Sequence, residues 1–168
     1  CTPDFNSPGS LLVALRGEGC WTIPLQGEQK IRRLQVSDRR EPRSARVLRS
    51  FEAAHTNVNQ TDRFAEILEI GVPAIRMDSQ AKYALLAAGE GELMLRLLSA
   101  ENPHYREKIW DQAAGSLILE EAGGKTTDMD GNSLDFSTGR TLDNNRGVLA
   151  SNGHMHDAAL KTLREIKV

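Results

Sequence analysis

The chain has 168 residues, of which 39% are hydrophobic and 26% are charged, proportions that fit a folded domain with its own core. Its formal net charge of −2 favours neither a nucleic-acid partner nor a membrane surface. No apolar run is long enough to span a bilayer, and residues 1–10 lack the features of a signal peptide.

The two cysteines, Cys1 and Cys20, form neither a disulfide framework nor a zinc-binding spacing. We expect Cys20 to be a small buried or half-buried residue, which is the usual place of a free cysteine. These observations favour a reducing, cytoplasmic setting. No methionine precedes Cys1, so we also expect a processed or truncated chain.

Residues 9–24 have the alternating pattern of a β-hairpin. Leu11, Val13 and Leu15 fall on one face of a first strand, and the Gly-Glu-Gly sequence at residues 17–19 predicts the turn into a second strand. Because a hairpin alone is at best marginally stable in water, we expect these strands to belong to a larger sheet.

Residues 26–50 are polar and basic, and two interpretations are open: a patch that binds anions, or a solvated connection. We favour the connection, because the stretch has no aromatic residues of the kind that stack on nucleic-acid bases. Its clustered arginines are Arg39, Arg40, Arg43, Arg46 and Arg49.

Strands and helices alternate from residue 47 to the end of the chain. Strands are predicted from residue 47 to near His55 and at residues 74–77, 92–97, 125–127 and 147–151. Helices are predicted at residues 61–70, 79–88, 109–122 and 154–166. We expect Thr61 or Asp62 to cap the first helix and Asp78 or Ser79 the second. This alternation predicts a layered α-β-α domain of the α/β class with a mixed, largely parallel sheet.

Polar side chains lie where an open α/β sheet holds its ligand, beyond the carboxyl ends of strands and near helix N-termini. Most are cations and hydroxyls, which suit a phosphorylated ligand. Asp111 adds a carboxylate in the first turn of the long helix, which suits Mg²⁺, because that ion takes oxygen ligands and shares them with substrate phosphate. The residues at these junctions are His55, Asp78, Ser79, Lys82, Arg96, Lys108, Asp111 and Arg140.

Each candidate also has a simpler interpretation. Asp111 is also a first-turn acid that a helix dipole favours, and Ser79 is also an ordinary cap. Lys82 and Arg96 also fit as surface charges, and His55 as a structural or exposed histidine. Residue patterns alone therefore indicate a phosphate-binding α/β domain and nothing narrower.

The motifs resemble a known family. Residues 108–124, KIWDQAAGSLILEEAGG, closely resemble the second signature of the inositol-monophosphatase-like, lithium-sensitive phosphatases, in which a Trp-Asp pair opens a helix and Gly-Gly ends it. Residues 76–97, RMDSQAKYALLAAGEGELMLRL, and 134–142, LDFSTGRTL, are similar to segments of 3'(2'),5'-bisphosphate nucleotidases, particularly the fungal ones. The resemblance covers the chain from about Gly9 to its end.

This resemblance implies a Mg²⁺-dependent phosphomonoesterase that removes the 3'-phosphate from 3'-phosphoadenosine 5'-phosphate, giving AMP, and that also acts on the sulfated analogue. It implies sensitivity to lithium and a place in sulfate assimilation. It makes Asp111 similar to the family's metal-binding aspartate. The positions that look like nucleotide contacts are His55, Ser79, Lys82 and Arg96, with Arg140 as a weaker candidate near the base or ribose.

The chain departs from the family in one respect. The other signature, Asp-Pro-Ile/Leu-Asp-Gly-Thr, and the upstream Gly-Glu-Glu run, which supply most metal ligands, are absent. We therefore interpret residues 1–46 as the remnant of an N-terminal domain and residues 47–168 as a C-terminal nucleotide-binding domain. The metal site would need the missing N-terminal half, so we expect the chain alone to be inactive.

Two alternatives to this function are open. One is an inositol phosphate phosphatase of the same superfamily, against which the runs at residues 79–83 and 139–142 argue. The other is a fragment that binds a nucleotide without catalysis.

Overall fold

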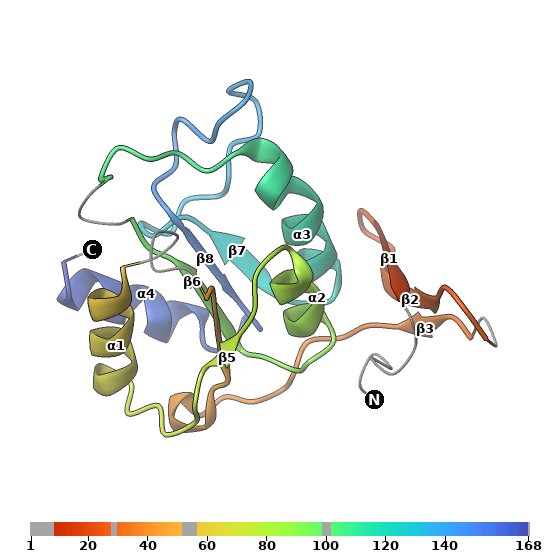
Figure 1. The fold of residues 1–168 in the computed structure, drawn as a ribbon, viewed down its shortest axis with the longest axis horizontal. Helices are drawn as coiled ribbons and strands as arrows, with labels where there is room; N and C mark the ends of the chain where they lie inside the picture. The colour runs from red at the N-terminus through yellow and green to blue at the C-terminus, as the bar shows by residue number, and fades with distance from the viewer. Residues whose placement is uncertain (1–8, 28–29, 52–56, 99–101, 168) are drawn as a thin grey trace.

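A computed structural model describes residues 9–27, 30–51, 57–98 and 102–167. Figure 1 shows a larger body of helices around one sheet, and beside it a small sheet formed by the N-terminal strands. In the part of the chain that is described, no helix is both long and apolar enough to cross a membrane.

The small sheet contains the predicted hairpin. β1 (Ser10–Leu15) and β2 (Gly19–Pro24) pair antiparallel, and Leu15 lies opposite Gly19 beside the turn. The sequence did not predict a third strand, β3 (Arg32–Arg33), which pairs with β2 and extends the hairpin to three strands.

The large sheet has five strands in the order β5-β4-β6-β8-β7. β4 runs parallel to β5 and β6, whereas β8 runs antiparallel to both β6 and β7. The predicted mixed sheet is confirmed, with its parallel part confined to three neighbouring strands. The strand bounds are β4 (Val47–Arg49), β5 (Ile75–Arg76), β6 (Leu93–Arg96), β7 (Lys125–Thr127) and β8 (Val148–Ser151).

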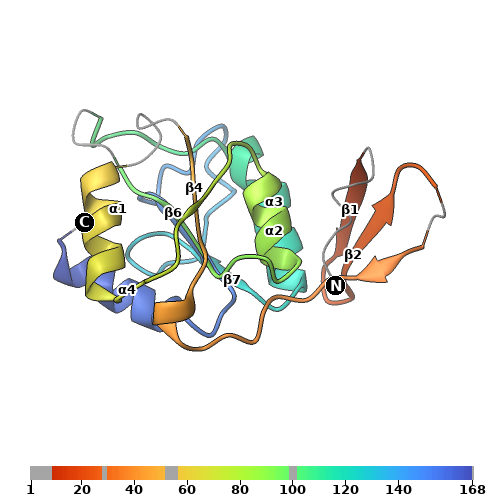
Figure 2. The ribbon, with the colours of Figure 1, turned by 60° about the horizontal axis from the view of Figure 1, so that its bottom comes forward.

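Helices cover both faces of this sheet, with α1 and α4 on one side and α2 and α3 on the other (Figure 2). Alternate strand residues reach opposite layers: Val47 packs with the α1 and α4 side chains, and its neighbour Leu48 with those of α2 and α3. The predicted α-β-α layering is therefore confirmed. The helices are α1 (Val58–Ile67), α2 (Ala81–Ala87), α3 (Ile109–Glu121) and α4 (His156–Glu165), with a short 3-10 turn, η1 (Pro42–Ser44).

Both predicted N-caps were wrong. α1 starts earlier than predicted because the Asn57 side chain accepts a hydrogen bond from the Gln60 amide (3.1 Å), which leaves Thr61 inside the helix. α2 starts later, with Gln80 as its N-cap and no side-chain cap bond. Ser79 has a left-handed backbone (φ 73°), which is not helical, and its hydroxyl accepts from the Ala81 amide.

The first strand of the large sheet is shorter than predicted. β4 ends at Arg49, because the Phe51 amide donates to the Asp78 carboxylate (3.2 Å) instead of to a neighbouring strand. The predicted strand end near His55 lies outside the described residues.

α3 connects the two sheets. The Glu121 carboxylate, at its last residue, accepts hydrogen bonds from the Gly17 and Gly19 amides in the β1–β2 turn (2.7 and 2.9 Å). Cys20 is fully buried, as predicted, in a cluster that also contains Ala87 of α2 and Ala122. The hairpin is thus fixed to the helices by hydrogen bonds and by apolar contacts.

The basic connection is ion-paired. Glu92 has no exposed surface and accepts hydrogen bonds from the Arg46 amide (2.7 Å), the Arg46 guanidinium (2.6 Å) and the Ser37 hydroxyl (2.8 Å). Burial acts to raise the pKa of Glu92, but the bonds from Arg46 and Ser37 outweigh it and lower that pKa. Arg43 and Arg49 also pair with carboxylates, so these arginines hold the connection in place.

Candidate functional site

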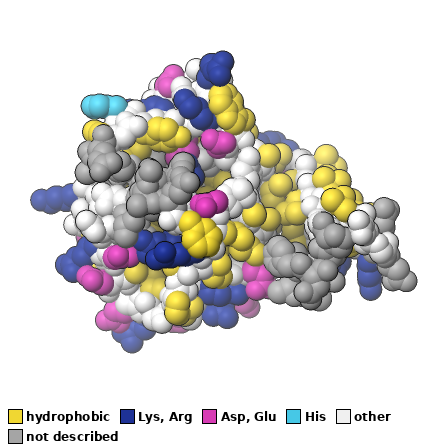
Figure 3. All heavy atoms as spheres, in the orientation of Figure 1, with side chains coloured by type: hydrophobic (Ala, Val, Ile, Leu, Met, Phe, Trp, Pro, Cys, Tyr) yellow, Lys and Arg dark blue, Asp and Glu magenta, His cyan; other side chains and the backbone are white. Residues whose placement is uncertain are grey.

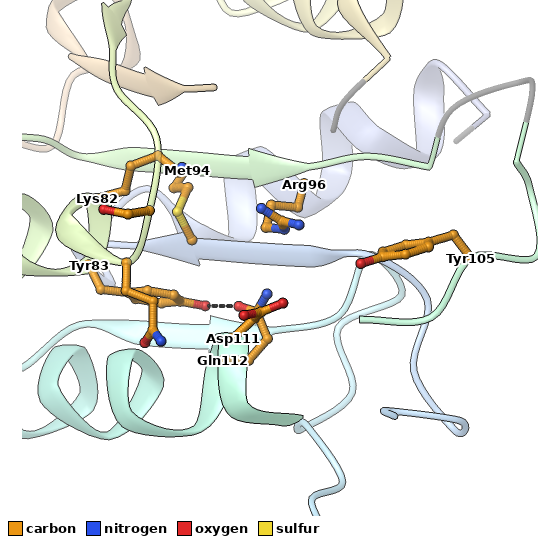
Figure 4. Close-up of a pocket in the computed structure, with 9 residues that line it drawn as sticks. Lys82, Tyr83, Met94, Arg96, Tyr105, Asp111 and Gln112 are labelled. Carbon is orange, nitrogen blue, oxygen red and sulfur yellow. Dashed lines mark hydrogen bonds between the residues drawn. The ribbon is translucent and has the colours of Figure 1, made fainter. Parts of the chain in front are cut away.

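A cavity of about 180 Å³ lies between α2, β6 and the start of α3 (Figure 4). It is at the carboxyl end of β6 and beside the first turn of α3, as expected for a ligand site in an open α/β sheet. The described residues that line it are Ser79, Gln80, Lys82, Tyr83, Met94, Arg96, Tyr105, Asp111 and Gln112.

Four of the six candidate site residues line this one cavity. Ser79, Lys82, Arg96 and Asp111 come from three separate elements and the loop before α2. The Arg140 guanidinium lies instead over the exposed Trp110 ring, 5.3 Å from its centroid, next in the chain to Asp111. His55 lies outside the described residues.

Lys82 is a buried cation, which removes its interpretation as a surface charge. It is 3% exposed, and its Nζ donates to the Ser50 hydroxyl (3.3 Å) and to the Met77 carbonyl (3.2 Å). Burial and the nearby Arg96 charge lower the pKa of Lys82, against the opposing effect of acidic neighbours. An ammonium has three donors, and the described residues accept from two of them.

Arg96 is the second cation of the cavity, and it is partly buried. Its side chain is 16% exposed, and its Nε donates to Oε1 of Glu107 (2.9 Å). Burial disfavours the charged guanidinium, but the Glu107 charge outweighs that effect and raises the pKa of Arg96. Arg96 is therefore held as a cation at the cavity wall.

Five lining residues were not among the candidates from the sequence: Gln80, Tyr83, Met94, Tyr105 and Gln112. The Tyr83 hydroxyl donates to Oε1 of Gln112 (2.7 Å), and the Gln112 amide donates to Oε2 of Glu107 (2.8 Å). Tyr105 lines the cavity near Arg96, and its pKa is raised mainly by burial. The one available signal was position, since Tyr83 and Gln112 directly follow Lys82 and Asp111 in the recognised motifs.

The loop before α2 is tied to the start of α3. Ser79 precedes α2 and has a left-handed backbone. The side-chain Nε2 of Gln80 donates to the Trp110 carbonyl (2.9 Å). This contact holds the Ser79 hydroxyl and the Asp111 carboxylate at the same cavity. Asp111 sits in the first turn of α3, where the helix dipole favours an anion and where a metal ligand would be equally well placed.

Asp111 is the one carboxylate among the described residues that line the cavity. Within those residues, no three His, Cys, Asp or Glu side chains gather into a group that could hold a metal ion. Mg²⁺ is usually bound through one or two carboxylates together with substrate phosphates. The cavity therefore supplies one fitting ligand and does not form a complete metal centre by itself.

The fold and the cavity define an α/β domain in which two cations, Lys82 and Arg96, line one cavity. A profile of the inositol monophosphatase family matches residues 5–167. The chain belongs to this family, and the resemblance inferred from its motifs is confirmed.

The curated relatives include nucleotidases. The chain is 42% identical over 159 residues to 3'(2'),5'-bisphosphate nucleotidase of Oryza sativa, covering 94% of this chain and 43% of the relative. It is 42% identical over 155 residues to the enzyme of that name from Schizosaccharomyces pombe, covering 88% and 43%. The chain thus spans less than half the length of these relatives.

Solved structures agree on the fold. An inositol monophosphatase from Anabaena superposes with a TM-score of 0.65 at 26% identity, covering 93% of this chain and 57% of that one. An IMPase/NADP phosphatase complexed with NADP and Ca²⁺ superposes with a TM-score of 0.63 at 20% identity, covering 91% and 49%. The second similarity bears on the fold alone.

Proposed function

We propose that this chain is the nucleotide-binding part of a phosphomonoesterase that removes the 3'-phosphate from 3'-phosphoadenosine 5'-phosphate, giving AMP, and that acts on the sulfated analogue. The observation that carries the proposal is a pair of cations, the buried Lys82 and the partly buried Arg96, at one cavity with Asp111. The names of the curated relatives support the same substrate class. A role in sulfate assimilation and a cytoplasmic setting belong to this proposal and rest on the resemblance.

In this proposal the cations hold the phosphate that is not cleaved. Lys82 offers a point charge and Arg96 a planar fork, and together they neutralise and orient a phosphate group. The Ser79 hydroxyl adds a hydrogen bond at the same wall. His55 and Arg140 complete the set, with Arg140, stacked on Trp110, near the base or ribose.

Asp111 is proposed as the metal ligand that this chain contributes. When bound, Mg²⁺ would polarise the scissile phosphate and activate a water molecule. The remaining ligands would come from polypeptide outside this chain, since the described residues supply one carboxylate to the cavity and the Asp-Pro-Ile/Leu-Asp-Gly-Thr signature is absent from the sequence. We therefore propose that residues 1–168 bind the nucleotide product without turning over the substrate.

The small sheet supports the proposed division into residues 1–46 and 47–168, which remains a prediction. Exposed apolar side chains gather on the N-terminal part of the molecule (Figure 3). Such a surface is usual where polypeptide is normally covered. The large apolar residues of this part that are at least half exposed are Leu11, Leu15, Leu25 and Ile31.

The experiment combines binding and turnover on residues 1–168. We expect calorimetry to show AMP binding that is lost in the Arg96→Met variant, and phosphate release from 3'-phosphoadenosine 5'-phosphate with Mg²⁺ to stay at background. Absence of AMP binding would refute the nucleotide site. Turnover near that of an intact enzyme would refute the proposed inactivity, and preferential binding of an inositol phosphate would favour the inositol phosphatase alternative.

A further inference from the structure

A chain of hydrogen bonds runs from the core to the cavity wall, and its last member is Arg96. It passes from the Tyr83 hydroxyl to Gln112 (2.7 Å), from Gln112 to Glu107 (2.8 Å), and ends where Arg96 Nε meets Glu107 (2.9 Å). We propose that Tyr83, Gln112 and Glu107 are positioning residues, which act through Arg96 to aim its guanidinium at the nucleotide phosphate. This inference rests on the proposed function.

The direction of every bond in the chain is determined. The Tyr83 hydroxyl donates to the carbonyl oxygen of the Gln112 side chain, so the Gln112 NH₂ group must face Glu107. Both Glu107 oxygens then accept, one from Gln112 and one from Arg96. A flip of the Gln112 amide would place two acceptors together at Glu107, so this orientation has no equal alternative.

The packing around these residues leaves them little freedom. Tyr83, Gln112 and Glu107 are 2%, 1% and 5% exposed. Gly115, one turn further along α3, lies so close to the Tyr83 ring that a Cβ atom there would overlap it. The absence of a side chain at Gly115 therefore sets where the Tyr83 hydroxyl points.

The planar shape of the guanidinium links the fixed position of Glu107 to the orientation of the Arg96 Nη groups in the cavity. The group is planar, so anchoring Nε on Glu107 restricts the directions of both Nη groups. In Figure 4 the guanidinium lies in the space bordered by Asp111, Gln112 and Tyr105. The Nε edge faces Glu107, and in this proposal the Nη edge faces a phosphate that Lys82 also contacts.

The location of this chain of bonds separates positioning from a purely structural role. Burying ionised groups seldom adds stability compared with apolar residues of similar size. The same helices already share an apolar cluster with Leu48, Leu86 and Leu119. The series of hydrogen bonds ends on Arg96, which lines the cavity. Its benefit therefore lies in orienting Arg96 and not in added stability.

The test uses Tyr83→Phe, which removes one buried hydroxyl and keeps the ring. The matched control is Thr162→Val on α4, which removes a hydroxyl that is 3% exposed as a residue and donates to the Ala158 carbonyl (3.1 Å). NMR would follow hydrogen exchange of the Arg96 Nε–H, with its signal assigned by the Arg96→Lys variant. Calorimetry would follow AMP affinity in the same samples.

We expect Tyr83→Phe to speed Arg96 Nε–H exchange and to weaken AMP binding about tenfold, whereas Thr162→Val changes neither. Gln112→Met, which breaks the series of hydrogen bonds one step nearer to Arg96, should have a larger effect on Arg96 Nε–H exchange and on AMP affinity. Should Tyr83→Phe fail to fold, Gln112→Met carries the test.

The outcomes separate this inference from the proposed function. Unchanged Arg96 exchange in the folded variants would overturn the positioning role whether or not AMP binds. Faster exchange with unchanged AMP affinity would overturn it as well. If the unmodified chain binds no AMP, the proposed function fails, and the exchange of Arg96 still decides whether Tyr83 and Gln112 position it.

Discussion

Lys82 holds its charge almost entirely out of water, and this has a cost in stability. Burial lowers its pKa, which means that the folded chain disfavours the ammonium relative to the unfolded chain. We predict that Lys82→Met keeps or raises the free energy of unfolding while it weakens AMP binding about 10- to 100-fold, the loss expected for a hydrogen bond to a charged group. Urea unfolding and calorimetry would measure the two effects.

The exposed Lys161 on α4 supplies the matched control, because Lys161→Met removes an equal charge away from the cavity. That variant should leave AMP affinity unchanged. A Lys82→Met protein that binds AMP normally, or one that loses affinity only because it is unstable, would contradict the assigned role.

His156 is a second buried ionisable residue, on the opposite side of the sheet. It has no exposed surface, with Nδ1 2.8 Å from the Ser151 hydroxyl and Nε2 3.0 Å from that of Thr127. Since the Thr127 hydroxyl donates to the Asp128 carbonyl, its oxygen accepts from Nε2–H of His156. Burial and the Lys125 charge lower the pKa of His156 from 6.5 to about 4.

The pH dependence follows from that shift. Between pH 6.5 and about 4 the unfolded chain binds the proton and the folded chain does not, so the stabilisation present above pH 6.5 is lost as the pH falls. We predict a loss of up to about 3 kcal/mol from this residue. Urea unfolding of the unmodified chain and of His156→Gln at several pH values isolates it, and parallel curves over this range would contradict the prediction.

At the scale of elements, one side chain of α3 makes hydrogen bonds to the β1–β2 turn, beside the apolar contacts of the hairpin. Glu121 accepts from both Gly17 and Gly19, and these are the bonds that tie the turn to the helix. We predict that Glu121→Ala speeds hydrogen exchange of these two amides with little effect on the amides of β8. Glu120→Ala, at an exposed position of the same helix turn, is the control and should leave the Gly17 and Gly19 amides protected.

Side-chain spacing predicted most elements, and it failed where the chain has no periodic pattern. The four helices and the longer strands follow from their apolar spacing. β3 has two residues, both arginine, and exists because β2 offers an unpaired edge. The start of α2 depends on the left-handed backbone at Ser79, which no spacing of apolar residues reveals.

At the scale of the whole molecule, the candidate site could be predicted for residues that end or follow a strand or lie near the start of a helix. Ser79, Lys82, Arg96 and Asp111 follow from the rule that ligands lie beyond strand ends, and the fold brings them to one cavity. Tyr83 and Gln112 could not be found in that way. Their hydrogen bond joins residues 29 positions apart and depends on how closely α2 and α3 pack at Gly115.

The basic segment that leads from the small sheet to the large one is bonded to Glu92, which lies beside β6. Glu92 bonds to Arg46 and Ser37, and Asn152 beside β8 donates to the Ser37 and Arg39 carbonyls. Removing one partner of a buried ion pair leaves the other charge uncompensated. We predict that Glu92→Ala lowers the free energy of unfolding by about 3 to 5 kcal/mol, measured by urea denaturation.

An exposed ion pair provides the comparison for Glu92. Arg63 and Glu66 lie three residues apart on α1 at 3.0 Å, and both side chains are more than 60% exposed. Water and salt screen such a pair, so Glu66→Ala should cost below about 1 kcal/mol. Equal losses in the two variants would show that Glu92 is no more important than a surface charge. A much larger loss at Glu92 would show that the order of the connection depends on this carboxylate.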